Sequence, residues 1–226
     1  MKFSEMQYER PNLETVKAGL AALNERLKAA KTYEEARAVF LEHEAQQMHV
    51  QTQATLASVR HSIDTRDKFY DAEETFWNAA TPELEEYEDV WKGAMLESPF
   101  RKEFAAEYGD LMFVNAEIDR KAFSPEIIPE SQQENELTQA YGKLIASAQI
   151  PFEGGVYTIS QLSPFKNDAD DARRLAAWQA EGAWYKEHQA EFDEIYDKLV
   201  HLRDTMGRKL GYEGYTTLGY YRMGRN

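Results

Sequence analysis

Metal or acid–base chemistry in this chain would have to use histidines and carboxylates, because its 226 residues contain no cysteine. Two imidazoles that hold one zinc ion from a single helix stand four residues apart. No two histidines have that spacing; they are His43, His49, His61, His188 and His201. The stretch His43-Glu44-Ala45-Gln46-Gln47 begins as a zinc motif does, but Gln47 stands where the second histidine belongs, and an amide is a poor zinc ligand. We therefore predict no metal-binding residue.

A di-metal centre inside a helical bundle needs a glutamate three residues before a histidine on each of two helices. The residues at that offset are Phe40, Gln46, Ser58, Tyr185 and Lys198. None of them is a glutamate, so a ferritin-like site is excluded. The sequence also lacks a GxSxG nucleophile motif, and Gly154-Gly155 lacks the lysine and the following helix of a phosphate-binding loop.

His201 could act as a general base, because Asp197 and Asp204 would lie on the same helical face. Ion pairs on the helix surface are the simpler interpretation of this spacing. The same interpretation applies to His188 with Glu191 and to His61 with Asp64. We therefore assign no catalytic and no cofactor-binding residue.

Charge and composition narrow the class of protein. Lys and Arg total 26 against 40 Asp and Glu, a formal net charge of -14, which disfavours nucleic acid and anionic membranes as partners. No apolar run is long enough to span a membrane, and the N-terminus is polar where a signal peptide would be apolar. We expect a soluble, cytoplasmic protein, which could form a homo-oligomer.

Helix signals recur along the chain. Thr32 and Glu35 have the spacing of a capping box. Thr81-Pro82, Ser98-Pro99 and Ser124-Pro125 each resemble an N-cap followed by proline at the first helical position, and Asn167 or Asp168 could open a further helix that Asp170 and Asp171 would favour. Apolar residues recur at helical spacing in stripes that we expect to be core: Leu13, Val16, Leu20, Leu23, Leu27; Phe69, Ala72, Phe76, Ala80; Leu84, Tyr87, Trp91, Met95; Leu137, Tyr141, Leu144, Ala148; and Phe192, Ile195, Leu199, Leu202, Met206, Leu210.

The stretch 150–159 breaks this pattern, since β-branched and aromatic residues surround Gly154-Gly155. It predicts a short β-hairpin. The predicted fold class is therefore mainly α, an array of antiparallel amphipathic helices with one hairpin near residues 150–160. We expect an N-terminal helical domain over residues 1–149, and a hairpin with the first helices of a second domain over 150–226.

The C-terminal stretch carries a resemblance. Residues 192–204, then Leu210-Gly211-Tyr212 and residues 218–223, resemble the oligoendopeptidase F family of thimet-type zinc metallopeptidases. Phe152-Glu153-Gly154-Gly155 and the helix with Asp170, Asp171, Arg173 and Arg174 fit the order of elements in that family. Residues 3–11 are similar to the start of its Pz-peptidase-like members. The resemblance is specific over 190–226 and weaker before residue 150.

This resemblance implies a mainly helical enzyme that hydrolyses short peptides with zinc-bound water inside a channel. The HExxH helix and the further glutamate ligand of the family would follow the position of Asn226, so the resemblance supplies no catalytic residue here. Four tyrosines crowd the final stretch with no later element to cover them, Tyr212, Tyr215, Tyr220 and Tyr221, and they favour a truncated chain.

Three hypotheses follow. In the first, the chain is the N-terminal wall of the peptide channel of a zinc oligoendopeptidase, and is inactive without the C-terminal catalytic half. In the second, it is a free-standing helical module that binds peptides or a protein without catalysis. In the third, a separate polypeptide supplies the HExxH half. The gene sequence downstream of Asn226 would discriminate among them.

Overall fold

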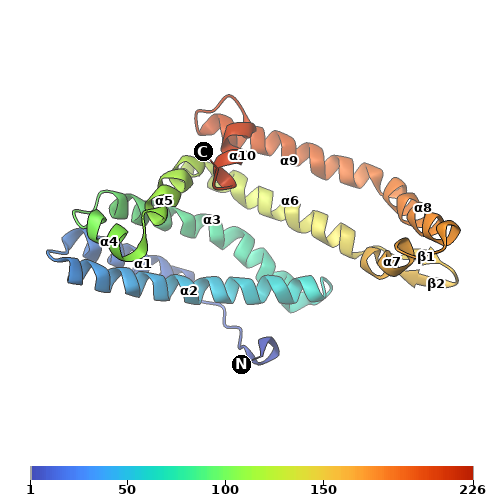
Figure 1. Ribbon diagram of the computed structural model, residues 1–226, viewed down its shortest axis with the longest axis horizontal. Coiled ribbons are helices and arrows are strands. Elements are labelled where there is room, and N and C mark those ends of the chain that lie inside the picture. Colours follow the sequence, from blue (N-terminus) through green and yellow to red (C-terminus); the bar gives the residue numbers. More distant parts are fainter. Residues whose placement is uncertain (1, 226) are drawn as a thin grey trace. The chain divides into compact units, whose positions relative to one another are not determined.

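The computed structural model describes residues 2–225 and is mainly helical, with ten α-helices and one two-stranded hairpin in that range (Figure 1). This confirms the predicted fold class. The chain forms two compact units: the first comprises the residues up to Gln132 together with those from Arg203 onward, and the second spans Gln133–Leu202. No helix in the described range is long and apolar enough to cross a membrane. The domain boundary expected at residues 149 and 150 stays a prediction.

The first unit is built on three long helices that pack side by side (Figure 1). They are α1 (Leu13–Ala29), α2 (Tyr33–Ile63) and α3 (Lys68–Leu96). The predicted stripe of α1 is confirmed, because Val16, Leu20, Leu23 and Leu27 are buried. Arg26 near the end of α1 pairs with Glu42 of α2, and Gln46 further along α2 donates to the Val16 carbonyl oxygen (3.1 Å) near the start of α1, so the two helices run antiparallel.

The capping box predicted at the start of α2 forms only in part. Thr32 accepts a hydrogen bond from the Glu35 amide (3.2 Å). The Glu35 carboxylate, however, accepts from the amide of Lys31 (2.7 Å) and not from that of Thr32. The Glu35 carboxylate therefore binds the residue before the cap, while Thr32 satisfies the first-turn amide of Glu35.

The prediction of a helix start at Thr81-Pro82 is wrong. The α3 helix begins after Asp67, whose carboxylate accepts from the amides of Phe69 and Tyr70, and continues through Pro82. Proline removes one helical hydrogen bond, but Pro82 is buried in the packed face of α3, and tertiary packing there maintains the helix.

The buried stripe in the first half of α3 is also displaced by one residue from the prediction. Phe69 and Ala72 are exposed and Phe76 is half-buried, whereas Glu73 and Trp77 are buried; only Ala80 of the predicted residues is buried. The stripe predicted for the second half is confirmed at Leu84, Trp91 and Met95.

An extended N-terminal segment lies against α2 and α3. Its Tyr8 hydroxyl donates to the buried Glu73 carboxylate, and Arg10 donates to the same group from Nε (2.8 Å) and from a terminal nitrogen (2.6 Å). Trp77 donates to the Tyr8 hydroxyl (3.2 Å), and Gln53 accepts from the amide of Glu9 (2.9 Å). This network fixes the segment after the short 3-10 turn η1 (Phe3–Glu5).

Two shorter helices complete the first half of the chain, α4 (Arg101–Tyr108) and α5 (Leu111–Ala122). The start of α4 lies two residues later than Pro99, because Ser98 accepts from the amide of Phe100 (3.2 Å) in a turn that precedes the helix. Ser124 does cap the 3-10 turn η2 (Pro125–Ile127), with proline at its first position as predicted, and this turn leads into α6 (Ile128–Ala146).

The second unit confirms the hairpin. Strand β1 (Ile150–Phe152) pairs antiparallel with β2 (Gly155–Tyr157), and the turn residues Glu153 and Gly154 both have positive φ (45° and 79°). That turn conformation explains glycine at position 154. The hairpin packs with α7 (Ile159–Lys166) and α8 (Asp171–Glu187) around a core that includes Leu162, Ala177 and Trp184.

The N-cap of α8 differs from the prediction. Asp170 itself is the cap, since its side chain accepts from the amides of Ala172 and Arg173. Asn167 and Asp168 lie before it and do not open the helix. Near the cap, Arg173 joins Asp168 (2.6 Å) and Glu153 (2.7 Å).

The last helices are α9 (Gln189–Lys209) and α10 (Tyr215–Arg222). The stripes predicted on α6 and α9 are only partly core: Met206 is fully buried, whereas Tyr141 is exposed. Leu218 of α10 is buried with Met206 and Ile127. The α9–α10 connection requires glycine at position 207, because a Cβ there would lie 2.4 Å from the Gly214 carbonyl oxygen.

Candidate functional site

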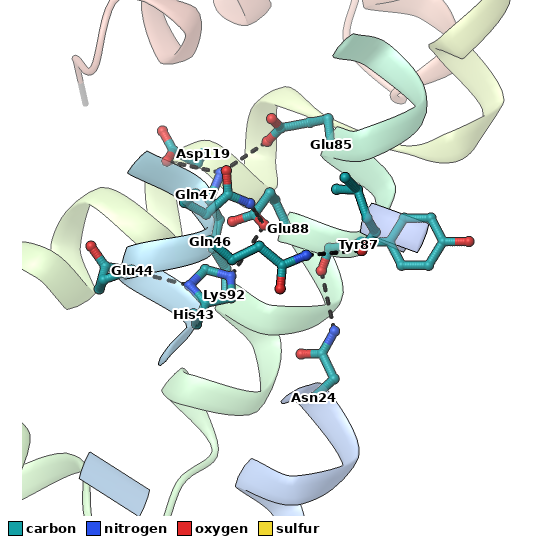
Figure 2. Close-up of polar contacts among 11 residues, drawn as sticks. Asn24, His43, Glu44, Gln46, Gln47, Glu85, Tyr87, Glu88, Lys92 and Asp119 are labelled. Carbon is teal, nitrogen blue, oxygen red and sulfur yellow. Dashed lines mark hydrogen bonds and ion pairs between the residues drawn. The ribbon is translucent and has the colours of Figure 1, made fainter. Parts of the chain in front are cut away.

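His43, the first residue of the incomplete zinc motif, is a buried hydrogen-bonding side chain of α2. It is 3% exposed, and its ring stacks on Trp91 of α3 with centroids 3.9 Å apart and 4° between planes. Nε2 lies 3.1 Å from Glu88 Oε1, and Nδ1 lies 3.4 Å from Glu44 Oε1 (Figure 2). The ring therefore joins α2 to α3 through one carboxylate and one indole.

Gln47 lies one helical turn after His43 and converges on the same carboxylate. Its Nε2 donates to Glu88 Oε1 (Figure 2). This convergence follows from the four-residue spacing, which places His43 and Gln47 on the face of α2 that packs on α3.

These residues do not fit a zinc ion. Both nitrogens of His43 are engaged by carboxylates, and Gln47 presents an N–H donor toward Glu88. Across residues 2–225, no group of three or more His, Cys, Asp or Glu side chains is arranged to hold a metal ion.

A second ion-pair group adjoins the first. Lys92 of α3 lies 2.9 Å from Glu85 of the same helix and 3.2 Å from Asp119 of α5. Burial alone would lower the pKa of Lys92, but the charges and hydrogen bonds of Glu85 and Asp119 outweigh it and raise that pKa above its ordinary value. Lys92 therefore stays charged at neutral pH.

Burial and neighbouring carboxylates also act in opposite directions on the pKa of His43. Burial lowers the pKa of the imidazole, and the hydrogen bonds to Glu44 and Glu88 raise it by more, so the pKa lies above its ordinary value. The charged form of His43 is thus stabilised inside the protein by two carboxylates.

These groups line a cavity of about 490 Å³ between α2, α3 and α5. Its polar lining includes His43, Gln47, Glu88 and Lys92. Its apolar lining includes Val50, Ala54, Trp77 and Leu84.

The other histidines lie apart from this cavity. His61 is buried, and its Nε2 lies 3.3 Å from Asp71 on α3, so the pairing expected with Asp64 is wrong. Asp64 instead pairs with Arg66 (2.9 Å).

His188 shares a hydrogen bond with the Trp184 carbonyl oxygen (2.9 Å) and stacks on that indole, in place of the expected pair with Glu191. His201 is exposed and lies 3.4 Å from Asp197, which agrees with a surface ion pair. His49 is exposed.

Sequence reasoning singled out His43 and Gln47 but missed Glu85, Glu88 and Lys92. Their spacing of three and four residues places them on one polar face of α3, which is a signal available from the sequence. What that face meets is decided by the packing of α2 and α5 on α3.

Comparisons with known proteins agree with the resemblance. Residues 3–123 match the family model described as the peptidase M3 N-terminal domain. Comparison with curated protein sequences gave no match.

Solved structures match over the whole chain. A structure of Pz peptidase A with an inhibitor is 38% identical with a TM-score of 0.95. Two structures described as oligoendopeptidase F, one of them from Bacillus anthracis str. Ames, are each 37% identical with TM-scores of 0.96 and 0.95. Each comparison covers 100% of this chain and 40% to 42% of the solved chain. The chain thus corresponds to less than half the length of these relatives, and it belongs to the M3 peptidase family, whose N-terminal domain it contains.

Proposed function

We propose that these 226 residues form the N-terminal part of a zinc-dependent oligoendopeptidase, where they build one wall of the peptide channel and restrict substrates to short peptides. The observation that carries this proposal is the full-length match of this chain to about 40% of each solved relative, at 37% to 38% identity. The remaining part of the enzyme would supply the zinc ligands and the hydrolytic step.

On this proposal the chain by itself does not hydrolyse peptides. This is supported by the hydrogen bonds of the segment His43–Gln47, which begins as a zinc motif. Its His43 and Gln47 side chains bind the carboxylates of Glu88 and Glu44 and not a metal ion. Its partners would be short peptides and the catalytic half of the same enzyme, in the cytoplasm.

The direct test is a peptidase assay of the purified chain with a quenched fluorescent peptide and added zinc. A full-length M3 relative serves as the positive control. We expect no turnover by the chain alone and turnover by the control. Hydrolysis that co-purifies with the chain and stops on addition of a chelator would refute the proposal.

A second candidate function is peptide or protein binding without catalysis. The cavity between α2, α3 and α5 favours it, because both polar and apolar side chains line it. Mixing the chain with a separately produced polypeptide that carries the HExxH half of the family separates the two functions. Restored hydrolysis supports the oligopeptidase, and binding of peptide by the chain without any gain of hydrolysis supports the binding module.

A further inference from the structure

The cavity between α2, α3 and α5 has the size and lining of a ligand site. Its volume of about 490 Å³ lies within the range of small-molecule sites. Val50 and Ala54 of α2 and Trp77 and Leu84 of α3 add apolar side chains to its lining. These side chains favour a ligand with an apolar stem.

The charges that line the cavity do not cancel. The lining includes four carboxylates, from Glu44, Glu85, Glu88 and Asp119, against one ammonium group, from Lys92. Even when His43 is charged, two negative charges remain without compensation inside the lining. An anionic ligand is therefore disfavoured and a cationic one is favoured.

The carboxylates also retain free acceptor capacity. Glu85 and Asp119 each accept from Lys92 through one oxygen, and Glu88 accepts from His43 and Gln47 through Oε1 alone. Among the residues that the structure describes, none donates to the second oxygen of these three carboxylates, and the Glu85 and Asp119 side chains are 38% and 47% exposed, so a ligand would replace water there. A ligand with several N–H donors could satisfy them.

A metal ion fits this place poorly. Lys92 already holds its ammonium group between Glu85 and Asp119, and no group of three or more potential metal ligands occurs within residues 2–225. An organic cation carries its charge at the end of a stem and leaves the Lys92 pairs intact.

We propose that this cavity binds an alkylammonium or guanidinium group on an aliphatic stem, with the cation near Glu85, Glu88 and Asp119, whose side chains Figure 2 shows, and the stem beside Trp77 and Leu84. Two sources have this chemistry, a lysine or arginine side chain of a peptide and a free amine. The peptide source rests on the proposed function, whereas the free amine does not.

The test is titration of the purified chain by calorimetry with capped lysine and arginine peptides, with cadaverine and agmatine, and with pentanol as a neutral probe. We expect saturable binding of the cationic probes and none of pentanol. Tighter binding of the capped peptides identifies a peptide side chain as the ligand, and tighter binding of cadaverine or agmatine identifies a free amine. Absence of saturable binding by every cationic probe, or equal binding of pentanol, overturns the proposal.

Two variants place the site. Glu85→Gln and Asp119→Asn should each weaken the cationic probe by about tenfold, the change expected when one charge-assisted hydrogen bond is lost. Glu117→Gln is the matched control, since Glu117 also lies on α5 and pairs with an arginine (2.9 Å) but does not line the cavity. Thermal unfolding of each variant confirms that it is folded.

Unchanged affinity in both cavity variants, or equal loss in the control, overturns the proposal. Because the readout is affinity, a negative result here leaves the hydrolysis test unaffected.

Discussion

Replacing Glu73 with glutamine should destabilise the first unit substantially. Glu73 is 4% exposed and accepts hydrogen bonds from the Tyr8 hydroxyl and from two nitrogens of Arg10. An amide at this position keeps one acceptor but presents its N–H groups to the guanidinium. Loss of one partner of a buried pair costs about 3–5 kcal/mol, and hydrogen bonds to charged groups contribute about 1.5–3 kcal/mol each.

The Arg10 side chain is 45% exposed, so water can solvate it in the variant, and the loss is reduced to about 2–3 kcal/mol. For a protein of this length that corresponds to a fall in melting temperature of about 4–12 °C. The matched control is Glu42→Gln, because Glu42 forms a bidentate pair with Arg26 (2.5 and 2.8 Å) on the exposed surface. Little change is expected there.

The assay is thermal unfolding at neutral and acidic pH. Hydrogen bonds from Arg10 and then from Tyr8 hold the pKa of Glu73 below its ordinary value, although burial acts in the opposite direction. A carboxyl with a depressed pKa in the folded state stabilises above its unfolded pKa of about 4.3, and that stability is lost as pH falls through the folded pKa. The difference between wild type and variant should therefore shrink below about pH 4. A loss of less than about 1 kcal/mol at pH 7, or a difference independent of pH, would refute this reasoning.

The same glycine-to-alanine change should alter the free energy of unfolding with opposite sign in two helices. Gly207→Ala should lower it by about 1–3 kcal/mol because the new Cβ meets backbone, whereas Gly182→Ala should raise it by about 0.5–1 kcal/mol because the new Cβ meets open space. Denaturant unfolding of both variants checks this. The pKa of His43 is raised in the folded state, so its contribution to stability is present below about pH 6.5 and is lost as pH rises through the folded pKa. A His43→Gln variant should lack this pH dependence of the melting temperature. Equal pH profiles in wild type and variant would contradict a raised pKa for His43. Lys166→Met should leave the buried Glu181 carboxylate without its partner. Amide hydrogen exchange should then increase within residues 133–202 and stay unchanged in α1–α3. Equal loss of protection in both regions would argue against two units.

Local signals in the sequence predicted what local physics controls. The apolar stripe of α1, the hairpin at 150–157 and the proline after Ser124 each depend on residues within a few positions of one another, and each is confirmed. The family was also recognised from contiguous motifs near the C-terminus, and the matches to M3 peptidases confirm it.

Contacts between distant residues required the tertiary structure. Pro82 lies inside a continuous helix because packing on neighbouring helices outweighs the missing hydrogen bond, which no local pattern reveals. Tyr8 meets Glu73 across 65 residues, and His43 meets Glu88 across 45. By itself the sequence determined the mainly helical class, the hairpin and the family, since these depend on periodicity and short motifs, but not the bounds of every helix. Only the packing of α2 and α5 on α3 decided that an incomplete zinc motif becomes one wall of an acidic cavity, because the side chains that meet there come from three separate helices.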